Sequence, residues 1–317
     1  MSNEAEELWK DRYEKWLHHL NAVIASVESA QAIPLGPSLV APEPPAPSDA
    51  RDRAAKIVYC APHPDDEALS GALALRLHLD SGAPVTNVAI TLGRDPAQKE
   101  RRLREIESAC RALDFRLIVA EPPHGFENVN EAARKQHPNE WAAKVETLAG
   151  IFDREKPDVV FAPHAQDFNT THVGTHYLAV DALGTHLERT KRKPVLLVET
   201  EIWHQIERPN LMVGVTPELV ARQLVGACEH GGEMRRNPYH LLHLCRLMDN
   251  VRRGSEVVGG QGAVAQKFPL AELYNVAVMN GKERIATRPE GVIVGPDRKA
   301  DVGWLEAQFL GKSKTQT

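Results

Sequence analysis

One short stretch, Ala61–Glu67, gathers polar side chains that could bind a metal or transfer protons. It reads Ala-Pro-His-Pro-Asp-Asp-Glu and directly follows the apolar run Ile57–Cys60. His63 and Asp66 are three residues apart in a turn that leaves a predicted strand, so both can reach one ion. A neutral imidazole and a carboxylate suit zinc at roughly 2.0–2.2 Å. A catalytic zinc normally has three protein ligands, and the pattern therefore requires a distant third.

The best candidate for the third ligand lies in the segment His164–His176, which follows another apolar run, Val159–Phe161. The carboxyl ends of parallel strands face one crevice, so His172 from this segment can converge on the first motif. Asp65, beside the proposed ligand Asp66, would then act as general base on a metal-bound water, whose pKa zinc lowers to about 7. Metal-dependent hydrolysis is thus one interpretation of the pattern.

Two other interpretations of the first motif remain open. Aspartates often cap helix N-termini, although capping explains one acid and not three consecutive acids with a histidine. Two histidines and one carboxylate also fit non-haem Fe(II) oxygenases, but their ligands more often lie in a β-barrel, which this sequence does not predict. The residues alone leave metal hydrolysis, capping and another ligand role undecided.

The elements that must position these residues alternate along the chain. Near-continuous apolar strands separated by helices predict an α/β fold, with a Rossmann-like, mostly parallel sheet covered by helices on both faces. The predicted strands are Lys56–Ala61, Val85–Leu92, Phe115–Ala120, Asp158–Ala162 and Val195–Glu201, and the predicted helices are Ala68–Ser81, Ala97–Leu113, Glu140–Glu155 and Val173–Arg189. The long segment Glu121–Asn139 at a carboxyl strand end is expected to face the substrate.

The flanking regions have other patterns. Apolar residues at helical spacing predict an amphipathic helix within residues 1–32, which would dock on the main domain or on a second subunit and so favours a homo-oligomer. A proline-rich linker follows at 33–50. The main domain is predicted at 51–280, with helices at Leu219–Glu229 and Tyr239–Arg252 and a tight turn at Asn280-Gly281. A helical and strand extension and a tail occupy 281–317.

Composition narrows the class of protein. The formal net charge is -5 and the pI near 6.3, which argues against a nucleic-acid or anionic-membrane partner. No apolar run reaches membrane-spanning length, and the acidic N-terminus lacks a signal-peptide pattern, so a cytoplasmic location is predicted. The four cysteines form no Cys-x-x-Cys pair and are expected to be reduced and buried.

The motifs together resemble those of the PIG-L/LmbE-like family of zinc-dependent de-N-acetylases. The resemblance rests on the stretch Pro62–Glu67 and on a later Asp-x-x-x-x-His run, and it extends roughly from Lys56 to Tyr274. Further similar segments are Val88–Gly93, Arg102–Glu105 and Leu270–Tyr274. The resemblance implies that His63, Asp66 and His172 bind zinc, that Asp65 is the general base and that Arg102 points into the substrate pocket. An arginine paired with an acid such as Glu105 is the alternative for Arg102.

One position departs from the family pattern. Its second motif commonly reads His-Pro-Asp-His, whereas this chain has Asn169-Thr-Thr-His172. Asn169 can donate a hydrogen bond to an oxyanion but cannot act as an acid. Asp167 is expected to orient the metal-bound histidine. The leaving amine would then receive its proton from Asp65 or from one of three histidines, namely His176, His204 and His230.

The resemblance implies a zinc-dependent amide hydrolase that removes an acyl group, with acetyl the first expectation, from a small-molecule N-acyl amino sugar such as N-acetylglucosamine, or from a glycoconjugate. Another divalent metal such as Fe²⁺ is an alternative to Zn²⁺. A second hypothesis is a non-catalytic or regulatory metal- or sugar-binding protein, because Asn169 replaces the usual histidine. A dinucleotide-binding oxidoreductase is disfavoured, since no Gly-x-Gly-x-x-Gly follows the first strand.

Overall fold

The computed structural model describes residues 10–12, 14–15, 17–18, 55–287 and 290–310. The described residues between 10 and 18 are helical, while most of the predicted N-terminal helix and the whole proline-rich linker lie outside the described residues. Strands β1 to β9 and helices α3 to α12, described below, lie in the unit that spans Gly36–Thr317.

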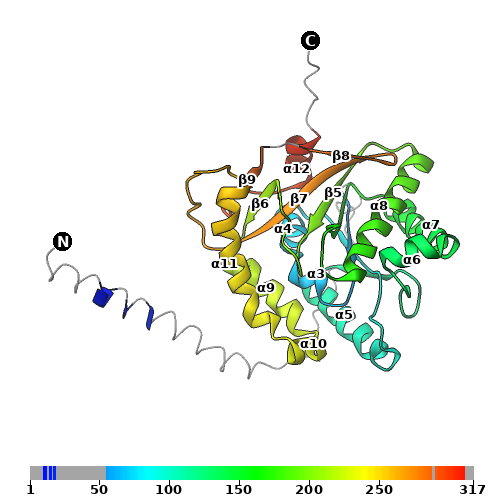
Figure 1. Cartoon of the computed structure of the whole chain (residues 1–317), viewed down its shortest axis with the longest axis horizontal. Coiled ribbons are helices and arrows are strands. Elements are labelled where there is room, and N and C mark those ends of the chain that lie inside the picture. The colour runs from blue at the N-terminus through cyan, green and yellow to red at the C-terminus, as the bar shows by residue number, and fades with distance from the viewer. Residues whose placement is uncertain (1–9, 13, 16, 19–54, 288–289, 311–317) are drawn as a thin grey trace, which may run out of the picture. The chain divides into compact units, whose positions relative to one another are not determined.

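A single nine-stranded sheet forms the centre of this unit (Figure 1). Its order is β3-β2-β1-β4-β5-β7-β6-β9, and β8 pairs with β7. Neighbours from β3 to β5 are parallel, as are β6 and β9, whereas β7 is antiparallel to all three of its neighbours. The strands are β1 (Ile57–Ala61), β2 (Val85–Ala89), β3 (Arg116–Val119), β4 (Val159–Pro163), β5 (Val195–Thr200), β6 (Leu211–Gly214), β7 (Ala271–Asn280), β8 (Glu283–Ala286) and β9 (Val292–Val294).

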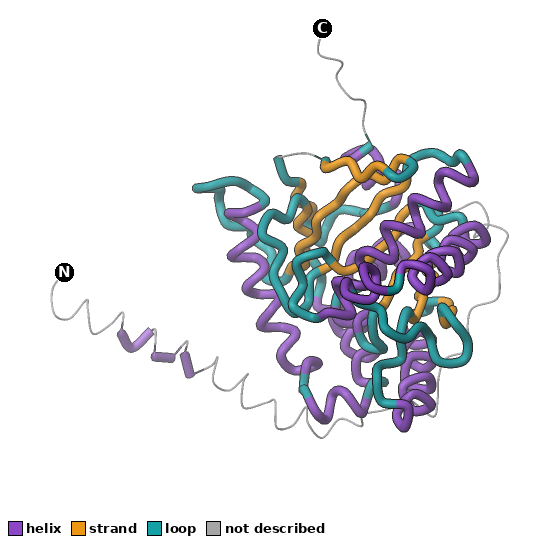
Figure 2. Tube along the Cα trace, turned by 45° about the vertical axis from the view of Figure 1, so that its right-hand side comes forward, coloured by secondary structure: helices purple, strands orange, loops and turns teal. Residues whose placement is uncertain are grey.

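Helices cover both faces of the sheet, which confirms the predicted fold class (Figures 1 and 2). On one face α7 and α8 pack against β1, β2, β4 and β5, and on the other α4 lies against β2 and α11 against β7. The helices are α3 (Asp66–Leu69), α4 (Ala72–Ser81), α5 (Lys99–Leu113), α6 (Glu131–Gln136), α7 (Pro138–Glu155), α8 (Thr170–Thr190), α9 (Pro217–Cys228), α10 (Gly231–Arg236), α11 (Tyr239–Val257) and α12 (Val302–Phe309), with a 3-10 turn at Pro96–Gln98. No described helix could span a membrane.

Strand β1 is buried on both sides, which explains its unbroken apolar sequence. Val58 and Cys60 point into the core under α7 and α8. On the opposite face, Tyr59 stacks on Phe161 of β4, with ring centroids 5.7 Å apart. The strand order reverses between β1 and β4, and in such sheets the ligand crevice lies outside the carboxyl ends of these two strands.

Two predicted elements differ from the structure. The helix predicted over Ala68–Ser81 is broken into α3 and α4 before Gly71, where a Cβ atom would lie 2.0 Å from the Glu67 carbonyl oxygen. The segment Glu121–Asn139 contains the short helix α6. The turn at Asn280-Gly281 is confirmed between β7 and β8, and Gly281 has φ 60°.

The cysteine prediction was half right. Cys60 and Cys110 are buried, but Cys228 is half-buried and Cys245 is exposed. The two cysteines whose burial was wrongly predicted lie on helices, α9 and α11, where neighbours in sequence point in different directions. Apolar neighbours in the sequence therefore did not indicate burial.

Candidate active site

The turn after β1 presents His63 and Asp66 at the carboxyl edge of the sheet. An Asp66 carboxylate oxygen accepts the His63 backbone N–H at 2.9 Å and lies 3.5 Å from His63 Nδ1. Asp66 is the first residue of α3, and its side chain is almost fully buried. The backbone therefore fixes the carboxylate against the imidazole ring.

The turn after β4 brings His172 to the same place. His172 lies in the first turn of α8 and is fully buried. Its Nε2 lies 3.3 Å from an Asp66 carboxylate oxygen, and its ring centroid lies 5.2 Å from that of His63. One ligand atom from each of the three residues can be chosen so that all lie within 4.8 Å of one another. The trio predicted from sequence is thus assembled.

This cluster has the character of a cation site. Both ring nitrogens of His172 are buried without a well-directed hydrogen bond, although Asp66 and Asp167 lie 3.3 and 3.4 Å away. Burial lowers the pKa of His172, but the two carboxylates outweigh it and raise the pKa to about 10. Burial likewise opposes ionisation of Asp66, yet His172 and His63 hold its pKa below the ordinary value. The cluster favours a positive charge, and imidazole with carboxylate is a donor set that suits zinc.

Asp65 has an unusual backbone conformation. Its φ is 122°, in a region that residues other than glycine rarely adopt, at a cost of about 1–3 kcal/mol. Its side chain makes no capping hydrogen bond to α3 but lines the adjacent cavity, so helix capping does not explain this acid. Burial, reinforced by the neighbouring Asp66 charge, raises the pKa of Asp65 well above its ordinary value, and Arg102 opposes that rise.

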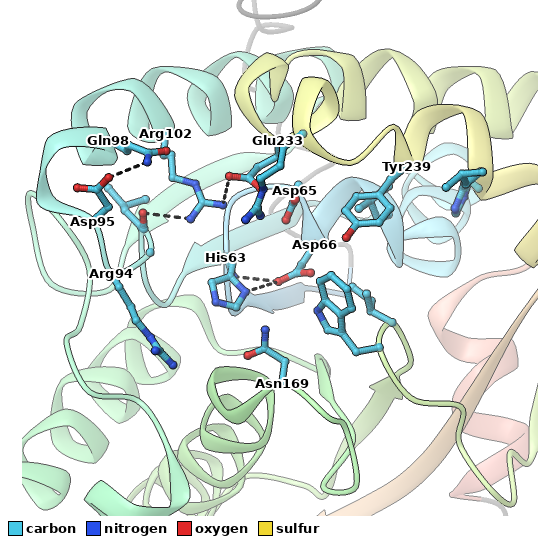
Figure 3. A pocket seen from close by; sticks show the side chains of 18 of the residues that line it. His63, Asp65, Asp66, Arg94, Asp95, Gln98, Arg102, Asn169, Glu233 and Tyr239 are labelled. Atoms are coloured by element: carbon cyan, nitrogen blue, oxygen red, sulfur yellow. Dashed lines mark hydrogen bonds and ion pairs between the residues drawn. The ribbon is translucent and has the colours of Figure 1, made fainter. Parts of the chain in front are cut away.

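Asn169 and Asp167 shape the start of α8. Asn169 is the N-cap, and its Oδ1 accepts the Thr171 N–H at 2.9 Å. This bond orients the side chain, which lines the cavity (Figure 3). Asp167 accepts the Asn169 backbone N–H at 2.8 Å and places its other oxygen 3.4 Å from His172 Nδ1. Asp167 therefore links the cap to the buried histidine.

Arg102 lies on the cavity wall, held by a residue distant in sequence. Its Nη2 pairs with Glu233 of α10 at 3.0 Å, and its Nη1 donates to the Leu92 carbonyl at 3.4 Å (Figure 3). Glu105, the alternative partner considered for Arg102, pairs instead with Arg101 at 2.5 Å. Arg102 thus does pair with an acid, but with Glu233 of α10 and not with Glu105 of its own helix.

The cavity beside these residues has a volume of about 520 Å³. It extends from His63 and Asp66 to a wall that the sequence patterns did not single out, formed by the segment after β5 and by α10 and α11. The wall residues include Ile202, Trp203, Glu233, Tyr239, Leu242, His243 and Arg246. These residues form no spaced motif, and only the fold brings them to the crevice.

The residues that line this cavity differ from two expectations, one about the segment Glu121–Asn139 and one about the proton donor. No residue of Glu121–Asn139 contributes to it, because this segment packs elsewhere: the Phe126 N–H bonds the Ile90 carbonyl, and Gly174 of α8 closely approaches Val129. Of the three histidines considered as proton donors, none lines the cavity. His176 bonds the Pro163 carbonyl, His204 stacks on His164, and His230 bonds Glu67.

Buried His243 makes the stability of the fold depend on pH. Burial lowers its pKa to about 3, assisted by the Arg246 cation, and its Nε2 lies 3.8 Å from a Glu272 carboxylate oxygen. In the unfolded chain the imidazole binds a proton near pH 6.5, so acid favours the unfolded state. We expect this residue to reduce the free energy of unfolding by up to about 1.4 kcal/mol per pH unit as the pH falls from about 6.5 toward 3.

The measurement is denaturant unfolding of wild type and His243→Phe at several pH values between about 7 and 5. The variant lacks the titrating group, so its free energy of unfolding should fall less with acid than that of wild type. Equal pH dependence of the two proteins would contradict this role of His243.

Residues 58–183 match the family model PIG-L, described as GlcNAc-PI de-N-acetylase. The chain contains a PIG-L domain. The match extends from β1 into α8 and includes all seven site residues predicted from the sequence, whereas the wall residues from 202 onward lie outside it. None of the curated proteins matches the sequence.

Solved structures share the fold of this PIG-L domain. The conserved protein TT1542 from Thermus thermophilus is 19% identical, with a TM-score of 0.52 over 78% of this chain and 100% of that one. GalB, the 4-carboxy-2-hydroxymuconate hydratase from Pseudomonas putida, is 18% identical, with a TM-score of 0.50 over 70% and 95%. N,N'-diacetylchitobiose deacetylase from Pyrococcus horikoshii is 16% identical, with a TM-score of 0.49 over 74% and 87%. The TM-scores of the first two structures show a shared fold, and identities this low do not show a shared reaction.

Proposed function

We propose that this chain is a metal-dependent amide hydrolase that removes an acyl group, acetyl in the first instance, from the nitrogen of an amino sugar or glycoconjugate. The observation that carries the proposal is the cluster of His63, Asp66 and His172, whose neighbours Asp65 and Asn169 line the same cavity. The description of the matching family model supports the reaction type.

His63, Asp66 and His172 would hold the metal, with Zn²⁺ the first choice and Fe²⁺ the alternative. A bound zinc ion would polarise the acyl oxygen and lower the pKa of water. Asp167, 3.4 Å from His172 Nδ1, would keep the other ring nitrogen directed at the ion.

Three other side chains that line the cavity would carry out the remaining steps. Asp65 would accept the proton of the attacking water as general base and return it to the leaving amine, since none of the three candidate histidines lines the cavity. Asn169 would donate its amide hydrogen to the oxyanion of the tetrahedral intermediate. Arg102, fixed by Glu233, would bind a sugar hydroxyl or a phosphate.

The test is release of acetate and free amine from a panel of N-acetylglucosamine derivatives by protein reconstituted with Zn²⁺ or with Fe²⁺. Turnover that depends on added metal supports the proposal. Metal binding without turnover on any member of the panel would favour the second candidate, a regulatory metal- or sugar-binding protein, which Asn169 at the usual histidine position motivates.

Asn169 can be tested separately from its role as a helix cap. We expect Asn169→Ala to lower kcat by about 10²–10³-fold, because one oxyanion donor is lost, while bound metal stays at the wild-type level. Asn130→Ala is the matched control, since Asn130 caps α6 through its Oδ1 and the Ala133 N–H at 2.8 Å. Each variant should lose about 1 kcal/mol of cap stability, and the control should keep its kcat. Equal kcat in both variants would remove Asn169 from the reaction.

A further inference from the structure

Glu67, the residue after the proposed ligand Asp66, is completely buried and is not part of the cavity wall. Its two carboxylate oxygens have different partners. Oε1 accepts from His230 Nε2 at 2.6 Å, and Oε2 accepts the backbone N–H of Asp65 at 3.1 Å. A buried carboxylate costs free energy unless both oxygens are satisfied, and here one of them is used on the backbone of the proposed general base.

The hydrogen bond to Asp65 lies at the one place where the turn is strained. The Asp65 carbonyl is already fixed, because it accepts the N–H groups of Ala68 and Leu69 at 3.1 and 3.0 Å. Among the described residues, the hydrogen-bond partner of its N–H is Glu67, and the N–H belongs to a residue with φ 122°. Without the carboxylate this buried donor would lose its partner, and the backbone would be free to relax toward negative φ. Relaxation would turn the Asp65 side chain away from its present direction.

His230 fixes Glu67 from a different part of the fold. It lies between α9 and α10, where its backbone N–H bonds the Ala227 carbonyl and its own carbonyl accepts the N–H groups of Glu233 and Met234. The imidazole is fully buried. The same corner supplies Glu233, which holds Arg102 on the cavity wall. One short segment thus supports two sides of the site without contributing a reacting atom.

We infer that Glu67 and His230 are positioning residues that hold the backbone of Asp65 in the conformation that directs its carboxylate into the cavity. The inference rests on the proposed function only in treating Asp65 as the general base. A purely structural role would instead resemble that of His186 of α8, another fully buried histidine, whose Nδ1 lies 2.7 Å from Asp153 of α7.

The experiment compares His230→Ala, Glu67→Gln and the control His186→Ala. We expect kcat to fall by about 10²-fold in His230→Ala and by less in Glu67→Gln, with KM and metal content within about twofold of wild type, because the base is misplaced and the ligands are not. His230→Gln, which can place an amide nitrogen near the Nε2 position, should recover most of the loss. His186→Ala should lose thermal stability while kcat stays at the wild-type value.

A crystal structure of His230→Ala gives the readout that does not depend on activity. We expect Asp65 to leave the positive-φ region while His63, Asp66 and His172 stay in place. An unchanged Asp65 backbone, or an unchanged kcat in the folded variants, would overturn the inference. If His230→Ala does not fold, the structure of Glu67→Gln decides in the same way. If wild type turns over no substrate, the proposed function fails, while the Asp65 conformation still tests the positioning role.

Discussion

Replacing Asp65 with asparagine should reduce kcat by about 10²–10⁴-fold, the usual contribution of a general base. The substitution removes the proton acceptor but preserves the size of the side chain. Asparagine tolerates positive φ at least as well as aspartate, so the backbone at φ 122° should persist. Asp65→Ala would mix loss of the base with relief of backbone strain and is the weaker test. The measurement is acetate release at saturating substrate, with metal content determined on the same sample.

Asp114→Asn is the matched control. Asp114 also has positive φ, at 58°, but it lies at the end of α5, where it pairs with His78 at 3.0 Å, and it does not line the cavity. We expect the control to keep its kcat. Wild-type turnover by Asp65→Asn would show that another group accepts the proton, and lost metal in that variant would assign Asp65 to the ligand set instead.

The second large effect is expected from loss of a ligand. We expect the His172→Gln variant to bind less than one metal ion per chain, even when metal is added in excess, and to lose turnover. His176→Gln should retain both, because His176 lies one turn further along α8 and bonds the Pro163 carbonyl instead of joining the cluster. Elemental analysis after gel filtration gives the metal content, and acetate release gives the turnover.

Chelator treatment of wild type should have the same effect reversibly. Since a metal that binds only the folded state stabilises it by about 4 kcal/mol at 1,000 times its Kd, removal should also lower the midpoint of thermal unfolding. Readdition of Zn²⁺ should restore turnover and midpoint together. A midpoint that does not respond to metal, in a protein that retains His172, would argue that the cluster does not bind an ion.

The sequence predicted the part of the site in which residues able to bind a metal directly follow the predicted strands. His63, Asp66 and His172 are metal-ligand types placed directly after apolar strands, and parallel strands must end at a common edge, so their meeting was predictable. The helices of the main domain were likewise predictable, because the spacing of apolar residues within one segment indicates a helix. These predictions required no knowledge of contacts between distant segments.

The parts that were missed depend on such contacts. Glu233 reaches Arg102 across more than a hundred residues of chain, and nothing near either residue indicates the pairing, so Glu105 in the same helix was considered instead. The segment Glu121–Asn139 was expected to face the substrate because of its length, but length does not specify which surface a loop covers. Its packing against Ile90 and Gly174 removes it from the cavity.

The cavity is built from two separate parts of the chain. The groups proposed to carry out the reaction lie between residues 63 and 172, whereas the opposite wall comes from residues 202–246, with Trp203, Tyr239 and Leu242 providing apolar surface. The contact between Arg102 and Glu233 joins the two parts. We therefore expect the range of accepted substrates to change with Trp203, Tyr239 and Leu242, provided that His230 and Glu233, which support the other part, are kept. Substitution of these three apolar residues, and not exchange of the whole segment, is therefore the direct route to new specificities.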